Sequence, residues 1–228
     1  MASARFAFAV LAFAFASQAF AVAQVFNKEG DVQRFVPGAS PTPVGNKERI
    51  AVTNTVTTGP GGKVILRFDD GLQIAMNENS AIRIVEYKYR DASFAAGEDK
   101  AVFELVRGAV RVVTGAMMER SANAFTMRGP QADIILREPA DFSVALVNPM
   151  YLSVHQGVVV VSNQVGRLGL AQGSTVSIAN SSAVPATLQP SALPQVTSQA
   201  FQNLQVAGVT TPGAAASASR SASVIAGS

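Results

Sequence analysis

The sequence contains no cysteine and no tryptophan, and His155 is its only histidine. The absence of cysteine excludes disulfide bonds, thiol catalysis, thiolate metal sites and a lipidated N-terminal cysteine. With one imidazole in the chain, a metal site would have to consist of carboxylate and carbonyl oxygens, the ligands that suit Ca²⁺ or Mg²⁺. We expect no cofactor, no metal and no catalytic residue, and the residue types alone leave the ligand-binding residues unknown.

Charged residues are scarce and unevenly distributed. They make up 14% of the 228 residues, against roughly a quarter in an average soluble domain. Apart from Arg5 and Arg220, all of them lie between residues 24 and 167, where 16 basic residues accompany 15 acidic ones. This near balance means that the basic isoelectric point is no evidence for a nucleic-acid partner, and we expect none.

The first 23 residues have the parts of a secretory signal peptide in order. Arg5 precedes an apolar run over 6–16, and two Ala-x-Ala patterns, which are typical of cleavage sites, follow at 19–21 and 21–23. An apolar run of this length makes about 16 Å of helix, too short for a hydrocarbon core of roughly 30 Å. The pattern predicts cleavage after Ala21 or Ala23, a periplasmic or secreted location, and no membrane span in the mature protein.

The C-terminal segment 185–228 differs in composition from the rest. It is rich in Ala, Ser, Thr, Gln and Pro, and its four prolines break any long helix. Within it, the spacing over 196–206 predicts a short docking helix whose apolar face consists of Val196, Ala200, Phe201 and Leu204. The segment is therefore interpreted as a linker, a short helix and a disordered tail after a body at 24–184.

The body is predicted to be all-β. Short runs rich in Val, Ile, Phe and Thr alternate with turn residues, as at Asp70-Gly71 between 63–68 and 72–76. The pattern predicts a single roll or sandwich of about 12 short strands. It is compatible with either one lobe or two. The other expected strands are at 82–90, 101–106, 109–113, 124–127, 132–136, 142–147, 151–154, 158–162 and 175–178.

One local pattern recurs in the body. A polar residue and a glycine precede an apolar run at 29–35, 107–113 and 156–161. Such a glycine is typical of a chain that turns sharply into a new strand. The intervals between the three copies are unequal, which favours an irregular roll over a regular solenoid.

Residues with catalytic or metal-binding chemistry have simpler structural explanations. No Gly-x-Ser-x-Gly elbow accompanies His155, which is interpreted as structural or exposed. Turn formation explains the cluster of Asp69, Asp70, Asn77, Glu78 and Asn79 better than a Ca²⁺ site. Five carboxylates are candidates by type for acid–base hydrolysis of a glycan, but no two can be placed at the required separation: Glu86, Glu104, Asp133, Glu138 and Asp141.

Two further motifs also have structural explanations. The run from Tyr87 to Arg90 interleaves aromatic and basic residues, as nucleic-acid platforms do, but is interpreted as an exposed edge strand protected by its cations. The glycine-rich 59–62 lacks the Lys-Ser/Thr end of a phosphate loop and is interpreted as a turn. The chain is therefore predicted not to be an enzyme.

The motifs of the body, taken in order, resemble those of the FecR domain, a periplasmic or secreted all-β module. The resemblance rests on 68–74 with the turn at 77–80, on 103–115 and on 154–161, followed by Gly173. These segments are similar to the family's Asp-Gly turn, its Gly-Ala-x-Arg-x-x-Thr-Gly core and its terminal Gly-Val strand. The resemblance covers about 25–178 and implies a FecR-like roll or sandwich.

Two departures qualify what the resemblance implies. In signalling members of the family, an anti-sigma segment and a transmembrane helix precede this domain, whereas here a predicted signal peptide occupies that place. Relatives often have an Ile-Arg-Gly-Thr step between central strands where this sequence has 136–141. We therefore expect an exported, non-enzymatic module that binds an envelope protein or glycan, with a structural or assembly protein acting through its uncharged tail as the alternative.

Overall fold

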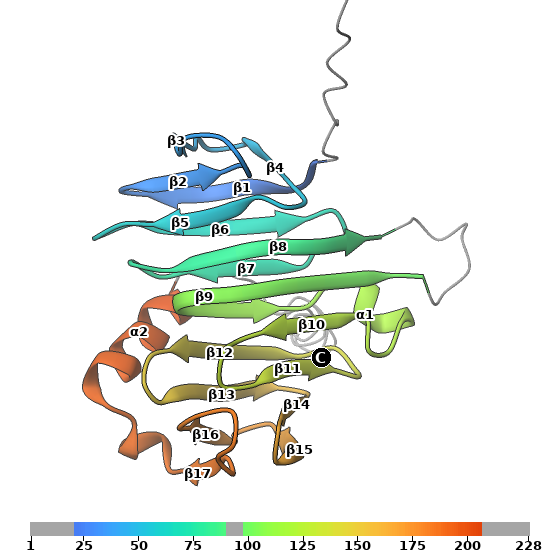
Figure 1. The fold of residues 1–228 in the computed structure, drawn as a ribbon, viewed down its shortest axis with the longest axis vertical. Helices are drawn as coiled ribbons and strands as arrows, with labels where there is room; N and C mark the ends of the chain where they lie inside the picture. The colour runs from blue at the N-terminus through green and yellow to red at the C-terminus, as the bar shows by residue number, and fades with distance from the viewer. Residues whose placement is uncertain (1–20, 90–97, 207–228) are drawn as a thin grey trace, which may run out of the picture.

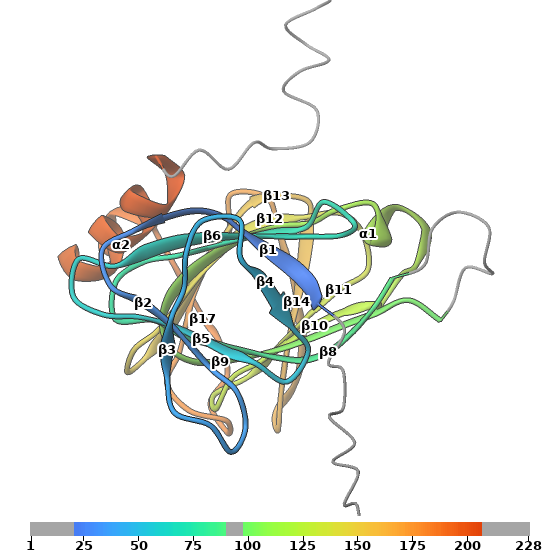
Figure 2. The same cartoon turned by 90° about the horizontal axis from the view of Figure 1, so that it is seen from above.

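The computed structural model describes residues 21–89 and 98–206, whose strands are stacked from β3 and β4 at one end to β17 at the other (Figure 1). The 17 strands form one hydrogen-bonded network, which is folded into two sheets that face each other (Figure 2). In pairing order, sheet A consists of β4 (Arg49–Ala51), β1 (Ala21–Glu29), β6 (Lys63–Phe68), β7 (Gln73–Met76), β9 (Lys100–Val113), β12 (Asp141–Leu146), β13 (Met150–Gln156), β16 (Thr175–Ile178) and β17 (Ala186–Leu188). Sheet B consists of β3 (Thr42–Pro43), β2 (Val32–Phe35), β5 (Thr55–Thr58), β8 (Ala81–Lys88), the same β9, β10 (Phe125–Arg128), β11 (Asp133–Leu136), β14 (Val158–Asn163) and β15 (Gly166–Ala171).

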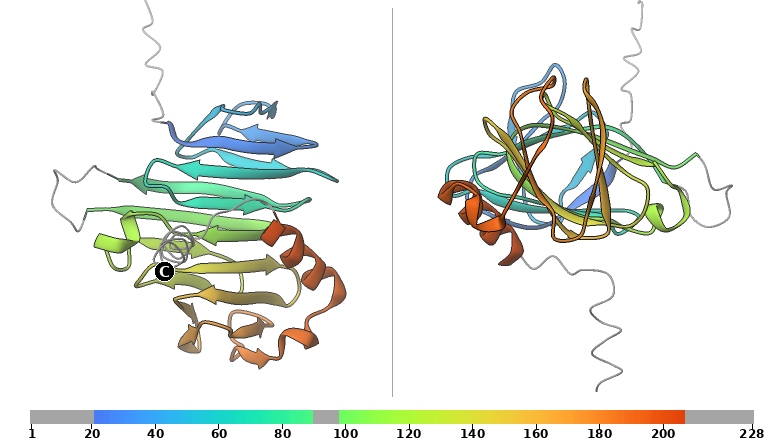
Figure 3. Two further views of the ribbon diagram at one scale, coloured as in Figure 1. Left: turned by 180° about the vertical axis from the view of Figure 1, so that it is seen from behind. Right: turned by 90° about the horizontal axis from the view of Figure 1, so that it is seen from below.

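The helices are short and lie outside the two sheets. Helix α1 (Met117–Arg120) is at one end of the sandwich, and a 3₁₀ turn η1 (Pro190–Ala192) leads into α2 (Gln195–Val206). Helix α2 packs against β9 and β12 on the outer face of sheet A, as the view from behind shows (Figure 3). Within the described ranges, no helix has the length and apolar character needed to cross a membrane.

Strand β9 belongs to both sheets and passes from one to the other at Gly108. Arg107 lies opposite Ala81 of β8 in sheet B, whereas Gly108 lies opposite Leu146 of β12 in sheet A. Gly108 has a φ of +86°, and a Cβ on it would lie 2.3 Å from Ser80 Oγ. The prediction of two separate strands at 101–106 and 109–113 was wrong, because the glycine redirects the chain without ending the strand.

The recurring polar residue and glycine mark the places where the chain changes sheet. Gly30 separates β1 of sheet A from β2 of sheet B, and Gly157 separates β13 of sheet A from β14 of sheet B. Both glycines have positive φ and closely approach the neighbouring connection, at Gly61 and Pro139 respectively. Each copy of the pattern therefore marks a point where the chain passes between the two sheets of the roll.

The space between the sheets is filled by one apolar core, which extends from Val22 in β1 to Ile178 in β16. The body is therefore a single lobe. Four phenylalanines form a ladder through this core, with ring centroids 5.2, 5.5 and 6.1 Å apart in the order Phe68, Phe103, Phe125 and Phe142. Since consecutive rings come from β6, β9, β10 and β12, the ladder joins the two sheets.

A buried carboxylate organises the Asp-Gly turn between β6 and β7. Asp70 Oδ1 accepts hydrogen bonds from the Tyr87 hydroxyl at 2.7 Å and from the Leu72 amide at 2.9 Å. Burial, and then the charge of Asp70, raise the pKa of Tyr87, so its hydroxyl keeps the proton that it donates. The turn is thereby anchored to β8 in the opposite sheet.

The structure departs from the expected strand list at both ends: β1 to β5 precede the first listed strand at 63–68, and β15 and β17 were not listed near the C-terminal end. The described residues contain 17 strands where about 12 were expected. Strand β15 was missed because its glycines and exposed Leu168 break the apolar alternation. The segment from 185 onward also contributes to the body: β17 pairs with β16, and Phe201 and Leu204 of α2 are buried on sheet A.

We predict that Gly108→Ala destabilises the protein far more than Gly173→Ala. Both glycines have left-handed backbone, at +86° and +82°, but a Cβ on Gly173 has open space around it. Gly173→Ala should thus cost only the backbone strain of about 1–3 kcal/mol, whereas Gly108→Ala adds the clash with Ser80. Urea unfolding measures both, and equal costs would contradict the sheet-crossing role of Gly108.

Candidate functional site

The only histidine contacts a serine on the outer face of sheet A. His155 of β13 and Ser143 of β12 lie on adjacent antiparallel strands, and Ser143 Oγ is 2.8 Å from His155 Nε2. Ser143 is completely buried, while His155 is half-buried. The sequence interpretation of His155 as structural or exposed did not foresee this partner, because the two residues meet only through strand pairing.

A buried ion pair lies beside this contact. Arg111 of β9 donates two hydrogen bonds to the carboxylate of Asp141 in β12, with Nε–Oδ1 and Nη2–Oδ2 distances of 2.9 and 2.7 Å. Burial, outweighing the charge of Asp141, lowers the pKa of His155, and the charge of Arg111 lowers it further. Removing one partner from such a buried pair typically costs about 3–5 kcal/mol.

This group contains the residue types of a serine–histidine–carboxylate triad, but its geometry does not suit nucleophilic catalysis. Ser143 has no exposed surface and lies within a strand, without a turn that would present its hydroxyl to a substrate. The carboxylate of Asp141 is bound by Arg111. The arrangement instead links β9, β12 and β13 across the outer face of sheet A.

The carboxylates considered for glycan hydrolysis are dispersed over both sheets. Glu86 binds Lys88 at 2.7 Å and Lys100 at 2.8 Å, and the hydrogen bond from Lys100 followed by that from Lys88 lowers its pKa. Glu104 forms an ion pair with Arg83 on sheet B. The remaining candidates are Asp141 in the buried pair on sheet A, Asp133 at the start of β11, and Glu138 in an exposed turn.

The Tyr-Lys-Tyr-Arg run does not form a stacking platform. Tyr87 points into the core, whereas Tyr89 stacks against Arg120 with the guanidinium carbon 4.7 Å from the ring centroid. Arg90 lies outside the described residues. Strand β5 pairs only with residues 81–83 of β8, so Tyr87 and Lys88 pair with β9 alone, as expected of an edge segment, but Tyr87 is buried where an exposed residue was expected.

The turn residues that could have bound Ca²⁺ make protein contacts instead. Asp69 pairs with Arg49 at 3.1 Å, and Glu78 Oε2 accepts a hydrogen bond from the Gly61 amide at 2.8 Å. Over 21–89 and 98–206, no group of three or more acidic or histidine side chains could hold a metal ion. The Oδ1 atom of Asn77 is buried and has no hydrogen-bond partner among the described residues.

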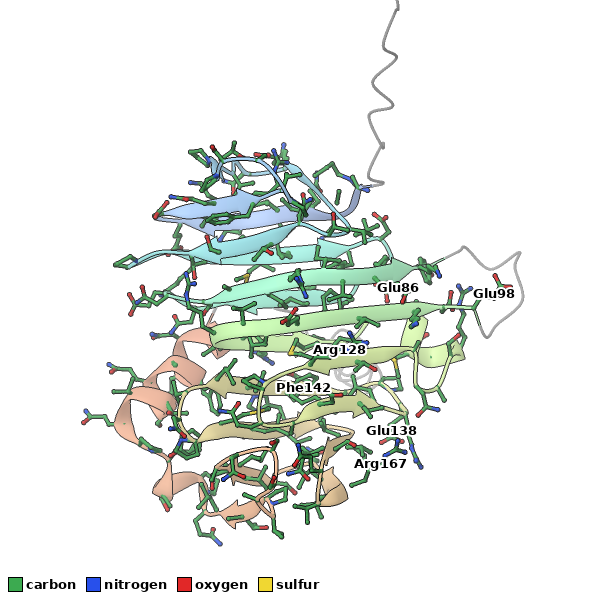
Figure 4. The ribbon with its side chains drawn as sticks, viewed as in Figure 1. Glu86, Glu98, Arg128, Glu138, Phe142 and Arg167 are labelled. Atoms are coloured by element: carbon green, nitrogen blue, oxygen red, sulfur yellow. The ribbon has the colours of Figure 1, made fainter. Side chains whose placement is uncertain are left out.

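The outer face of sheet B has an ordered pattern of charge. Residues directly opposite one another on successive strands form a charged row: Arg83, Glu104, Arg128, Asp133, Ser162 and Arg167. Figure 4 labels Arg128 and Arg167 in this row, with Glu86 on the neighbouring strand β8. A second row beside it consists of β-branched residues: Val102, Thr126, Ile135 and Val160.

Neither helix of the described residues covers this face, because α2 packs on the opposite sheet and α1 lies at one end (Figure 2). Val102 in the second row is nevertheless buried. Arg83 retains half of its side-chain exposure and Glu104 retains 38%. Opposite charges on facing residues stabilise the sheet, and they also present alternating charge to a partner. Sequence reasoning missed the charged row because it depends on the register of six strands.

We predict that the stability of the folded chain falls as the pH is lowered below about 6.5. The pKa of His155 is lower in the folded chain than its ordinary value of 6.5, so the unfolded chain takes up the proton first as the pH falls. The loss continues until the folded-state pKa is reached. Thermal unfolding between pH 7.5 and 5.5 measures it, and His155→Gln should lack this component; the same slope in both proteins would refute the assignment.

The sequence model of the family described as FecR protein matches residues 54–160, from the end of the β4–β5 connection into β14. No curated protein matches the chain at a significant level.

Two crystal structures of a candidate anti-sigma factor from Parabacteroides distasonis ATCC 8503, at 1.65 and 2.50 Å resolution, are similar to the chain. Their sequence identities are 20% and 19%, and the TM-score is 0.47 for both. Each alignment covers 59% of this chain and 59% of the other, so the chain spans well under two thirds of these proteins. The sequence match therefore assigns residues 54–160, which lie within the two-sheet roll, to a FecR domain.

Proposed function

We propose that the chain is an exported, non-enzymatic interaction module that recognises a partner protein in the cell envelope. The observation that carries the proposal is the open outer face of sheet B with its charged row. A FecR domain supports an interaction role, and the buried Ser143 offers no accessible nucleophile. The partner class and the periplasmic or secreted location rest on this reasoning and on the predicted signal peptide.

The dimensions of the charged row suit a protein partner. Neighbouring strands lie about 4.8 Å apart, so six successive positions span roughly 24 Å. A standard interface buries about 800 Å² on each partner, which needs a surface of this width. Alternating charges next to a β-branched row would fix the register of the partner more strongly than they would attract it.

The edge of sheet B offers a second element for recognition. Strand β15 pairs with β14, and its next position in the sheet is not occupied by any strand of the described residues. Five of its six residues are exposed. An edge of this kind accepts an extended segment through backbone hydrogen bonds, so a partner that docks on the charged row can continue the sheet at β15.

The start of β1 favours one of the two predicted cleavage sites. Val22 and Ala23 are buried in the core, and the Asp69 amide donates a hydrogen bond to Val22 O at 3.2 Å. Cleavage after Ala23 would remove both residues from the end of sheet A. Cleavage after Ala21 keeps both residues, and we propose that the signal peptide is cleaved at this site.

The exported protein should therefore begin at Val22. N-terminal sequencing of the protein recovered from the periplasm or the medium tests this directly. A sequence that begins at Gln24 would show that β1 forms without its buried first residues, and one that begins at Ala2 would refute export by a cleaved signal peptide.

Site-specific cross-linking in the producing cell tests the docking face. A photo-reactive residue placed at Arg128 should yield an adduct with another envelope protein, because Arg128 is in the centre of the charged row. The same residue at Arg67, on the outer face of sheet A, is the matched control and should yield none.

The row itself is tested by reversing one charge. With the photo-reactive residue at Arg167, Arg128→Glu should reduce the adduct at least tenfold while thermal unfolding is unchanged. Equal adducts from positions 128 and 67, or none from either, would refute the proposed face. An adduct with a second copy of the chain would instead favour the assembly function.

A further inference from the structure

Each of the two sheets ends in strands that pair on one side only within the described residues. Sheet A ends at β4 and β17, and sheet B ends at β3 and β15. Three of these terminal strands are two or three residues long, whereas β15 has six residues. Strand β15 is therefore the longest terminal strand in the described part of the chain (Figure 1).

The edge of β15 lacks most of the features by which proteins prevent a further strand from pairing. Such features are prolines, bulges, very short strands and charges that point inward. Strand β15 pairs with β14 over six consecutive positions without a break in register, and its one charged residue, Arg167, belongs to the charged row on the outer face. By contrast, β3 at the other end of sheet B has two residues, one of which is Pro43. The backbone of β15 is thus able to accept a strand.

The charged row ends at β15 with a cation that has no acidic neighbour. Arg128, in the middle of the row, has Glu104 on one adjacent strand and Asp133 on the other. Arg167 has the neutral Ser162 on its adjacent strand, and Asp133 lies two strands away, at roughly 10 Å. Arg167 forms no ion pair with any described residue. An acidic residue opposite it on an added strand would continue the alternation of charge and stabilise the pairing.

The two residues that follow Arg167 determine the rest of the pattern. Leu168 lies opposite the buried Val161 on the core side of sheet B, yet 37% of Leu168 is exposed at this edge. An apolar residue beside the acidic one would cover it. Gly169 lies opposite Val160 at the end of the second row, and a Cβ on it would meet no atom within 4 Å. A β-branched residue two positions from the acidic one would occupy this space and continue the row.

We propose that β15 binds an extended segment of the partner protein in which an acidic residue lies between two apolar residues. The acidic side chain pairs with Arg167 on the outer face, the apolar side chains point toward the core, and backbone hydrogen bonds join the segment to β15. A basic residue at the central position is repelled by Arg167, which thereby selects the segment. The β15 strand of a second copy contains no acidic residue and does not fit this pattern. The proposal rests on the protein-docking function proposed above and adds the chemistry of the partner at one edge.

Binding of a short peptide to the exported chain, measured by fluorescence anisotropy, tests the proposal. The probe is a fluorescein-labelled, C-terminally amidated peptide with the sequence Ser-Thr-Val-Glu-Val-Thr-Ser, which reads the same in both directions and so fits either strand orientation. The parent chain should bind this peptide, and replacing its Glu by Lys should weaken binding roughly fivefold, because like charges then face each other. The Arg167→Glu chain should reverse the order of the two peptides.

Arg128→Glu is the matched control, because it makes the same change of charge in the same row. It lies three strand spacings from β15, or roughly 14 Å, which exceeds the screening length of about 8 Å at physiological ionic strength. The Arg128→Glu chain should therefore rank the two peptides as the parent chain does. Both arginines are exposed, so both variants should keep the unfolding temperature of the parent chain.

Pairing through the backbone is tested with two N-methylated forms of the probe, which carry methyl groups on alternate amides. Successive amides of a strand point to opposite sides, so the amides of one form face β15 and those of the other face away from it. One form should lose binding, and the other should bind like the unmodified peptide. Equal effects of the two forms would show that the peptide does not add to the sheet as a strand.

The outcomes separate this proposal from the docking function. Absence of binding by the parent chain, or the same order of peptides with the parent and Arg167→Glu chains, would overturn the proposal, while an adduct from position 128 would still support the docking face. Reversal of the peptide order without an adduct from position 128 would support the edge site and refute the docking face. Self-association of the chain that the probe displaces would show that a second copy occupies β15 and would overturn the choice of partner.

Discussion

The passage of β9 from one sheet to the other at Gly108 is the constraint on which the rest of the structure depends. Its first half holds β8 and β10 in sheet B, and its second half holds β7 and β12 in sheet A. A single residue therefore sets the register of both sheets at once. Ser80 occupies the space that a side chain at 108 would need, and its hydroxyl oxygen accepts a hydrogen bond from the Ala109 amide at 3.0 Å.

The same crossing determines the environment of Asn77. The turn from β7 to β8 must pass close to Gly108 to change sheets, and its backbone hydrogen bonds are made with Thr58 and Ala109. These contacts hold the turn without help from the Asn77 side chain. Asn77 lies between α2 and the sheet at the border of two cavities, and its Oδ1 is buried without a hydrogen-bond partner. Its position follows from the topology, whereas its lack of a partner requires a separate explanation.

Sequence patterns predicted the class of fold and much of the strand list, since runs such as 63–68 alternate clearly and are bounded by turn residues. They also detected the repeated glycine pattern, but periodicity along one chain cannot reveal which sheet a strand enters. Contacts that arise from register stayed hidden for the same reason. Ser143 and His155 meet through one strand pair, and the charged row depends on six strands, so a shift of one residue would abolish each of them.

The two outer faces of the sandwich differ in what covers them. Sheet A is covered by α2, whose Phe201 and Leu204 bury an apolar patch around Ala145. Sheet B carries alternating charges instead, which keep the face hydrated while the three arginines and two acidic residues of the charged row nearly balance. A partner that docks there must match the order of the charges, since a surface with balanced charge attracts no partner by net charge alone. Selectivity of this kind is compatible with the near-neutral body, and it explains why the basic isoelectric point carries no information about the partner.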